Sequence, residues 1–282
     1  MKPYNEIFIN NIHNRLVYSF FIDDRIKSFN DHISYKVHLE CLKAIFEMYP
    51  FFHEVIFVIT ANDITNKLIN ELKYKLSNIC INVINLEFII EQNDAYSREG
   101  NVFKKYILDK LDDYDGITLF FHNKGLDSKY DNDFPYYWII GQYYFNIIHL
   151  MYFQYDSFIK SKKLLYGWPY INDNYYKQWF YAGSCYWMKT QELKKYLDSH
   201  YIDHEDKITL KTVAEYYFPT RVELDYVDYP LSNIIKEKCE LLFNHNFSDE
   251  SMNEYMKYVL SYNEYINFND FFKNIMNKIN EV

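Results

Sequence analysis

Four residues suited to ligand chemistry stand in a row after a short apolar run in the middle of the chain. They are His122, Asn123, Lys124 and Gly125, and the run before them is 117–121. A run of this length with no polar face is typical of a strand buried on both sides of a sheet. Open α/β sheets bind their ligands at the carboxyl ends of such strands. An imidazole, an amide and an ammonium at that position predict a ligand-binding site at the end of this strand.

Polar residues also follow the first apolar segment, at 15–22. Asp23 and Asp24 come directly after it and can bond a ribose or hold a metal ion, or can simply cap a turn. Tyr18 and Ser19, late in the segment, can stack on and bond a nucleotide base, or can be plain strand core. We include all four residues in the candidate site.

A third group of candidates opens a helix that is expected near 99–112. Arg98 and Asn101 stand at its start. Helix amino termini and arginine side chains both favour phosphate, although Arg98 can equally be a surface charge. The pair adds a phosphate-binding element to the candidate site.

Strands alternate with single helices over the first ~125 residues. The expected strands lie at 15–22, 54–60, 79–87 and 117–121. Three helices are expected between them: one at 34–49, one that begins after a cap at Asn62 or Asp63, and one near 99–112. This alternation predicts right-handed crossovers and a Rossmann-type, mainly parallel α/β sheet flanked by helices. In the usual doubly wound order the first and fourth strands are neighbours, which places Asp23 and Asp24 beside His122–Gly125.

The second half has a less regular pattern and many aromatic residues. The expected elements are a helix at 135–155, a strand at 164–170, a β-prone segment at 179–189 interrupted at 182–184, helices at 191–199 and 207–217, and more helix from about 230. The 31 Tyr and 23 Phe fit AT-rich coding and are also compatible with a carbohydrate site.

Composition narrows the classes of protein to consider. The formal net charge of -9 argues against non-specific binding of nucleic acid. No apolar stretch is long enough to span a membrane, and the first residues lack the apolar core of a signal peptide. The 4 Cys are widely spaced, without a zinc pattern, as expected of a reducing compartment. A cytoplasmic protein is therefore expected, and its oligomeric state is left open.

Four stretches together resemble a known family. The strand end at 121–125 is similar to the His-Thr-Lys-Gly hallmark of bacterial and viral glycosyltransferases of polysaccharide and lipopolysaccharide clusters. Trp138 follows at the family's spacing, 181–189 keeps a Tyr, Gly, Trp and Lys of a later block, and 214–217 is similar to its Ala-Glu and aromatic pair. The resemblance covers roughly 95–220.

The resemblance implies a GT-A-like fold and transfer of a sugar from a UDP-, dTDP- or GDP-sugar to a hydroxyl. The acceptor would be a glycan or a lipid-linked glycan of surface polysaccharide synthesis. It also implies one domain over 1–228, with a nucleotide-binding half at 1–125 and an acceptor half at 126–228. Residues 229–282 would form a helical C-terminal extension.

The chain departs from the family pattern in two ways. Asn123 replaces the usual Thr, and the fourth strand does not end in the Asp-x-Asp with which many GT-A enzymes hold a metal ion. Asp127, Asp131 and Asp133 come shortly afterwards and can hold Mg²⁺ or Mn²⁺ with the diphosphate, or can belong to a solvated loop.

An inverting enzyme also needs a base for the acceptor hydroxyl. Glu215 is the first candidate and Asp127 the second, because a carboxylate within hydrogen-bond reach can accept that proton. A retaining enzyme needs no such base, and the sequence does not decide between the two. Glu215 can also be an exposed helix residue.

Small and aromatic residues are expected on the acceptor side of the cleft. Gly183 and Ser184 would let a substrate approach the backbone, or Gly183 would mark a strand bulge. Trp138 and Trp187 can cover a sugar face, with a place in the core as the alternative for Trp187. We expect the segment 181–189 to cross close to His122–Gly125.

Two other functions fit the same sequence. A nucleotidyl- or phosphotransferase would use the same lysine and helix terminus, and a non-catalytic carbohydrate-binding protein would keep a degenerate site. Dehydrogenases and P-loop ATPases are disfavoured, because neither glycine-rich phosphate motif is present.

Overall fold

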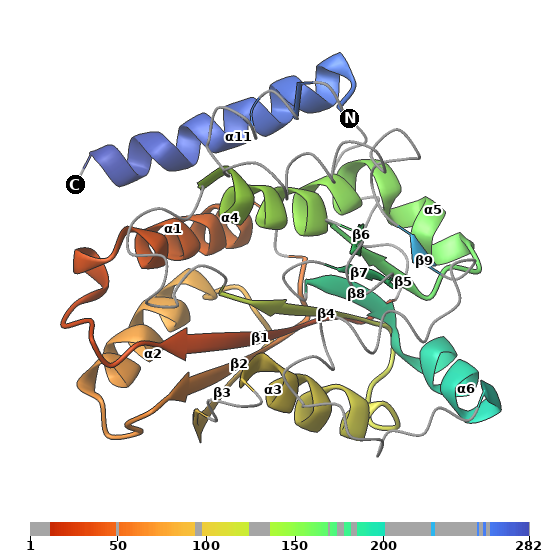
Figure 1. Cartoon of the computed structure of the whole chain (residues 1–282), viewed down its shortest axis with the longest axis horizontal. Helices are drawn as coiled ribbons and strands as arrows, with labels where there is room; N and C mark the ends of the chain where they lie inside the picture. Colours follow the sequence, from red (N-terminus) through yellow and green to blue (C-terminus); the bar gives the residue numbers. More distant parts are fainter. Residues whose placement is uncertain are drawn as a thin grey trace.

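The computed structural model describes residues 12–48, 51–93, 98–123, 136–168, 170–173, 178–181, 185–200, 227–228, 253, 256–257 and 260–281. Within these residues the chain forms a seven-stranded mixed sheet in the order β3-β2-β1-β4-β8-β5-β9 (Figure 1). Helices cover both faces of this sheet. The α/β class expected from the sequence is confirmed.

The first four strands form the parallel part of the sheet. β1 lies between β2 and β4 and pairs in parallel with both, and β2 pairs in parallel with β3. The strands are β1 (Asn14–Ile22), β2 (Glu54–Ala61), β3 (Asn85–Gln92) and β4 (Ile117–His122). The helices between them are α1 (Ile33–Met48), α2 (Lys67–Ile79) and α3 (Arg98–Tyr106). The predicted neighbourhood of the first and fourth strands is confirmed.

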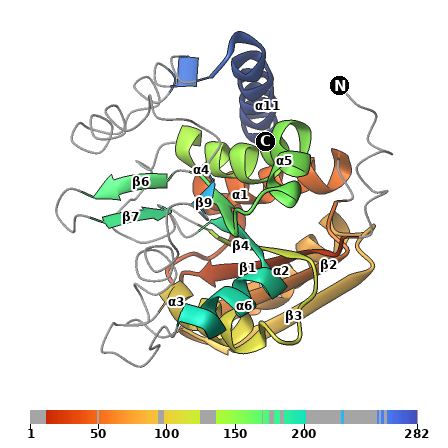
Figure 2. The ribbon, with the colours of Figure 1, turned by 90° about the vertical axis from the view of Figure 1, so that its right-hand side faces the viewer.

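The remaining strands make the sheet mixed. β8 (Tyr186–Lys189) pairs antiparallel with both β4 and β5 (Leu165–Gly167), so β5 runs in the direction of β4. The two-residue β9 (Val227–Asp228) closes the far edge, parallel to β5. Figure 2 shows a separate antiparallel pair beside the main sheet, β6 (Tyr170–Asp173) with β7 (Gln178–Tyr181).

The pleat of the sheet divides the core into two layers. Even-numbered residues of β1, such as Tyr18 and Phe20, pack with α1, α2 and α4 (Tyr136–Tyr143), whereas Val17 packs with α3 and α6 (Thr190–His200). The chain continues from α4 through the π-helix η5 (Tyr144–Gln154) into α5 (Tyr155–Lys160). Short 3-10 turns precede α1 and follow α3, at Phe29–Asp31 and Leu108–Lys110.

The last helix, α11 (Tyr262–Asn280), packs on α1 and α4 and belongs to the larger core layer. Phe268 of α11 contacts the aromatic rings of Tyr144 and Phe145. One carboxylate has two tasks at the start of the helix. Glu264 accepts the backbone N–H of Ser261 in a capping box, and its other oxygen lies 3.0 Å from His149 Nε2. The hydrogen bond from His149 lowers the pKa of Glu264 to about 2.

Two predicted boundaries were wrong. The third strand begins at Asn85, not near residue 79, because α2 continues to Ile79. The side chains that follow, Ile81 and Ile84, are each 78% exposed. The helix before it is capped by Asn66, whose side chain accepts Leu68 N–H, and not by Asn62 or Asp63. Asp63 instead accepts both the N–H and the hydroxyl of Thr65, a local turn that delays the helix.

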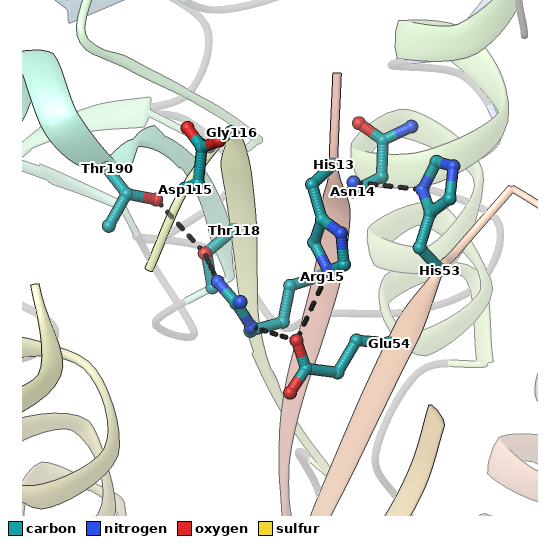
Figure 3. A network of polar contacts seen from close by, with 9 residues as sticks. All are labelled: His13, Asn14, Arg15, His53, Glu54, Asp115, Gly116, Thr118 and Thr190. Carbon is teal, nitrogen blue, oxygen red and sulfur yellow. Dashed lines mark hydrogen bonds and ion pairs between the residues drawn. The ribbon is translucent and has the colours of Figure 1, made fainter. Parts of the chain in front are cut away.

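A polar network closes the amino ends of the parallel strands (Figure 3). Arg15 on β1 donates to Glu54 on β2 at 2.7 Å, and its guanidinium lies 3.6 Å from the centre of the Tyr114 ring. His13 Nε2 is 3.2 Å from the same Glu54 carboxylate and its ring stacks on His53. This edge is opposite to the predicted ligand-binding edge, so we assign the network to the fold.

The protein is expected to lose stability as the pH falls through about 6.5, the ordinary pKa of histidine. Burial and the neighbouring His13 lower the pKa of His53. Below its ordinary pKa the unfolded chain therefore binds a proton that folded His53 does not, and stability falls until the folded pKa is passed. In His53→Asn, which keeps an acceptor for the N–H of Asn14, the free energy of unfolding should change less between about pH 7 and about pH 5.5. Urea titrations at the two pH values measure it, and an unchanged difference would contradict this role of His53.

Candidate active site

The candidate site lies where the carboxyl ends of β1 and β4 meet. Ser19 and His122 are partners in the parallel register. Ser19 is two residues after Val17, and His122 is two residues after Phe120, so each shares a face of its strand with a residue of the smaller core layer. Both side chains therefore lie on the face of the sheet that α3 covers. Both are buried. A hydroxyl and an imidazole are therefore on neighbouring strands at this edge.

Asn123 continues the sheet with its side chain. Its backbone N–H donates to Ser19 O at 3.3 Å, as a further rung of the β1–β4 ladder. Its amide then bonds both backbone groups of Phe21: Oδ1 accepts Phe21 N–H and Nδ2 donates to Phe21 O, each at 2.8 Å. The amide was predicted to contact the donor. In the structure the amide is bonded to β1 and supports the strand end, a role that the sequence did not predict.

Tyr35, on the first turn of α1, ties the end of β1 to the helix layer. Its hydroxyl donates to Phe21 O at 3.1 Å and accepts Asp23 N–H at 2.8 Å. Burial raises the pKa of Tyr35, so the hydroxyl keeps its proton. Phe21 O thus receives bonds from both Asn123 and Tyr35.

Asp23 is paired with Arg25. The backbone N–H and Nε of Arg25 donate to one carboxylate oxygen, at 2.9 and 2.8 Å, and Nη2 bonds the other. These bonds lower the pKa of Asp23, so the carboxyl is ionised at neutral pH. The Arg25 side chain is 58% exposed, and Asp24 beside it is exposed. The pair brings a guanidinium, which the sequence did not single out, to the carboxyl ends of β1 and β4, an edge that we call the mouth.

Three predicted ligand-binding aromatics lie in the core. Tyr18 is 0% exposed and its hydroxyl is 2.7 Å from that of Tyr143, so it has no free face for a nucleotide base. Trp187 is also 0% exposed, stacks on Phe52 and donates through Nε1 to the backbone of Asn146. Trp138 is buried too and packs on Trp168. The core interpretation is therefore correct for Tyr18 and Trp187, and Trp138 joins them.

The predicted phosphate-binding helix begins at Arg98. α3 follows β3, so its amino terminus lies toward the carboxyl edge of the sheet. Asn101 on its first turn is half-buried, and Phe103 packs on Phe120 of β4 at a ring distance of 5.0 Å. The helix backbone at Arg98 is described, but its side chain lies outside the described residues.

The register of β8 brings the second half of the chain to the same edge. Tyr186 pairs with Phe120, two positions before His122, and Lys189 pairs with Ile117 at the opposite end. Going back along β8 toward Tyr186 therefore leads to the carboxyl end of β4. This register supports the expected approach of the 181–189 segment to the site.

Several predicted site residues lie outside the described residues: Lys124, Gly125, Asp127, Asp131, Asp133, Gly183, Ser184 and Glu215. Among the residues that are described, no group of three or more His, Cys, Asp or Glu is arranged to hold a metal ion. In the same part of the chain no helix is long and apolar enough to cross a membrane.

Sequence reasoning missed two residues of the mouth, Tyr35 and Arg25. Tyr35 lies on the predicted first helix, but nothing local indicates that its hydroxyl reaches back to β1. Arg25 could have been found from its spacing, because Asp23 and Arg25 flank one residue in a turn directly after a strand.

Comparison of the chain with family models, with curated proteins and with solved structures found no significant match.

Proposed function

We propose that the protein is a glycosyltransferase that moves a sugar from a nucleotide-sugar donor to a hydroxyl acceptor. The observation that carries this proposal is the meeting of β1 and β4 at a switch point of a parallel sheet, with Ser19 and His122 side by side there. Nucleotides bind at such points in open α/β sheets. Lys124 follows directly in the chain, and this order of groups resembles the family hallmark noted above.

The groups of the mouth suit the parts of a nucleoside diphosphate. His122 and Lys124 would bond the diphosphate oxygens, and the amino terminus of α3 would add backbone N–H donors. Arg25 offers a further cation, although it is bonded to Asp23. Asp23 and Asp24 would lie near the ribose. No role is left for Tyr18 in holding the base.

The transfer itself would displace the nucleotide from the sugar. The acceptor hydroxyl oxygen forms a bond to the anomeric carbon while the bond from that carbon to the diphosphate oxygen breaks. The nucleoside diphosphate leaves with the electron pair, and Lys124 and His122 stabilise its charge. In an inverting enzyme Glu215, or Asp127, takes the proton of the hydroxyl. Segment 181–189 would supply the acceptor side.

A divalent ion has little support in the described part of the mouth. Asp23 is bonded to Arg25, and the described residues hold no carboxylate or histidine cluster suited to a metal ion. A bound Mg²⁺ or Mn²⁺ would instead rest on Asp127 and Asp131, where it would balance diphosphate charge. The proposed acceptor is a glycan or a lipid-linked glycan. We place the reaction in the cytoplasm, which agrees with the buried thiols of Cys41 and Cys80.

Thermal shift with nucleotide sugars tests the proposal. Wild-type protein is heated with UDP-, dTDP- and GDP-sugars and, separately, with nucleoside triphosphates. A ligand that binds the folded state raises Tm. A rise with one class of nucleotide sugar, followed by release of its sugar, is the expected result. A response to triphosphates alone would favour a nucleotidyl- or phosphotransferase. No response to any of them would contradict the proposal and favour a non-catalytic protein.

Lys124→Ala is expected to weaken donor binding without unfolding the protein. One charge-assisted contact of this kind contributes about 1.5–3 kcal/mol, which corresponds to about 10- to 150-fold in Kd. Titration calorimetry with the responding nucleotide sugar measures the loss. Lys110→Ala is the matched control, because Lys110 is an exposed lysine that donates to Asp113, three residues away, at 3.0 Å. Equal affinities in the two variants would remove Lys124 from the site.

A further inference from the structure

We propose that Tyr35 and Asn123 are positioning residues for the nucleotide-binding mouth. Together they fix the last residues of β1 and the point where the chain leaves β4. This inference rests on the proposed function, since it assigns the two side chains to donor binding. It differs from the expectation that Asn123 contacts the donor, and it adds Tyr35, a residue of α1.

Asn123 ends the β1–β4 ladder with a side chain. A strand partner would offer Phe21 one acceptor and one donor from its backbone. The Asn123 amide offers the same two groups at 2.8 Å each, so Phe21 is satisfied without another residue of β4. Asn123, the residue directly before Lys124 in the sequence, is thereby fixed to the end of β1.

Tyr35 holds the same strand end from the other side. Its hydroxyl joins Phe21 O to Asp23 N–H, so it bonds the residues before and after Ile22. Asp23 in turn receives three bonds from Arg25. One connected chain of hydrogen bonds thus runs from the end of β4 through β1 to the exposed guanidinium of Arg25.

These bonds are placed where they affect ligand geometry more than the core. They join the terminal residues of two strands, and strand ends are held by fewer neighbours than strand centres. The groups that they orient, Asp23 and Arg25, are among those assigned to the donor. Binding depends on such groups being held in place before the ligand arrives.

The test compares the two ends of the same strand. Tyr35→Phe and Asn123→Leu remove the polar groups at the carboxyl end of β1 without adding charge. Tyr155→Phe and Asn14→Leu are the matched controls at its amino end, where the buried Tyr155 hydroxyl donates to Asn14 Oδ1 at 3.1 Å and Asn14 donates to Phe51 O. Tm and the Kd for UDP, dTDP and GDP are measured for all four variants and the wild type.

The mouth variants are expected to raise the Kd of the nucleotide that binds by about five- to tenfold, as for one lost hydrogen bond. The control variants should lower Tm by about as much as the mouth variants do, and they should keep the wild-type Kd. Tyr35→Phe changes only a hydroxyl, so it supplies the answer if Asn123→Leu does not fold.

Two results would overturn the inference alone: wild-type Kd in the mouth variants, or an equal loss of affinity in the controls, which would make the effect one of stability. A wild-type protein that binds none of the three nucleotides would instead refute the proposed function, and the inference with it.

Discussion

Gly116→Ala is expected to destabilise the fold by about 2–6 kcal/mol. Gly116 has a φ of 78°, which an alanine adopts only with strain of about 1–3 kcal/mol. An added Cβ would also lie 2.1 Å from the backbone oxygen of His13, so the turn or the start of β1 must move, at a further cost of about 1–3 kcal/mol. That oxygen accepts Ile117 N–H at 2.9 Å, the bond that leads into β4. Urea denaturation of the purified variant measures the loss.

Gly141→Ala is the control for this substitution. Gly141 lies within α4, where the atoms nearest to an added Cβ belong to the side chains of Trp168, at 3.1 Å, and Met256, at 3.5 Å. Alanine also favours a helix over glycine by about 1 kcal/mol. We expect a small net change of either sign at Gly141. Equal destabilisation at the two glycines would contradict the argument from the conformation of Gly116.

Trp187→Ala is expected to cost about 3–5 kcal/mol of stability, as for a large aromatic removed from a core. The ring is parallel to that of Phe52, with centroids 5.7 Å apart, and it meets Phe51 edge-on at 5.6 Å. Its indole N–H also donates to the backbone oxygen of Asn146. Chemical denaturation measures the loss, and Trp187→Phe should recover part of it.

The same variants test the sugar-platform interpretation of Trp187. If the ring only fills the core, Trp187→Phe keeps the wild-type Kd for the acceptor and for the donor wherever the protein is folded. A large loss of acceptor transfer with an unchanged Tm would show instead that the ring contacts a substrate.

The strands that the sequence predicted well are those buried on both faces. β1, β2 and β4 are mostly apolar on both faces and are buried along nearly their whole length, and their positions follow from that pattern. β3 is an edge strand that alternates exposed and half-buried residues and contains Glu87 and Glu91. The apolar residues before it, near 79–84, were more hydrophobic and drew the prediction toward them. Hydrophobicity therefore located the centre of the sheet and misplaced its edge.

The place of the candidate site was also predictable, because it follows from strand order. The roles of single side chains were not. Tyr18 and Ser19 are adjacent in sequence, but the pleat turns Tyr18 into the core and Ser19 toward α3. Asn123 was recognised as a polar residue at the right point, yet its bonds to Phe21 depend on the register of β4 against β1. The contact of the Tyr35 hydroxyl with the end of β1 depends on how α1 packs against that strand.

The two tasks of Glu264 make the end of the chain cooperative with the rest of the fold. One oxygen closes the first turn of α11 and the other meets His149 inside the domain. The carboxylate is drawn into one geometry by both partners, so forming the helix start and attaching the helix favour each other. We infer that α11 does not detach from the domain while its first turn stays formed. Loss of the His149 contact loosens the first turn, and fraying of that turn weakens the contact. The last helix and the sheet should therefore unfold as one unit.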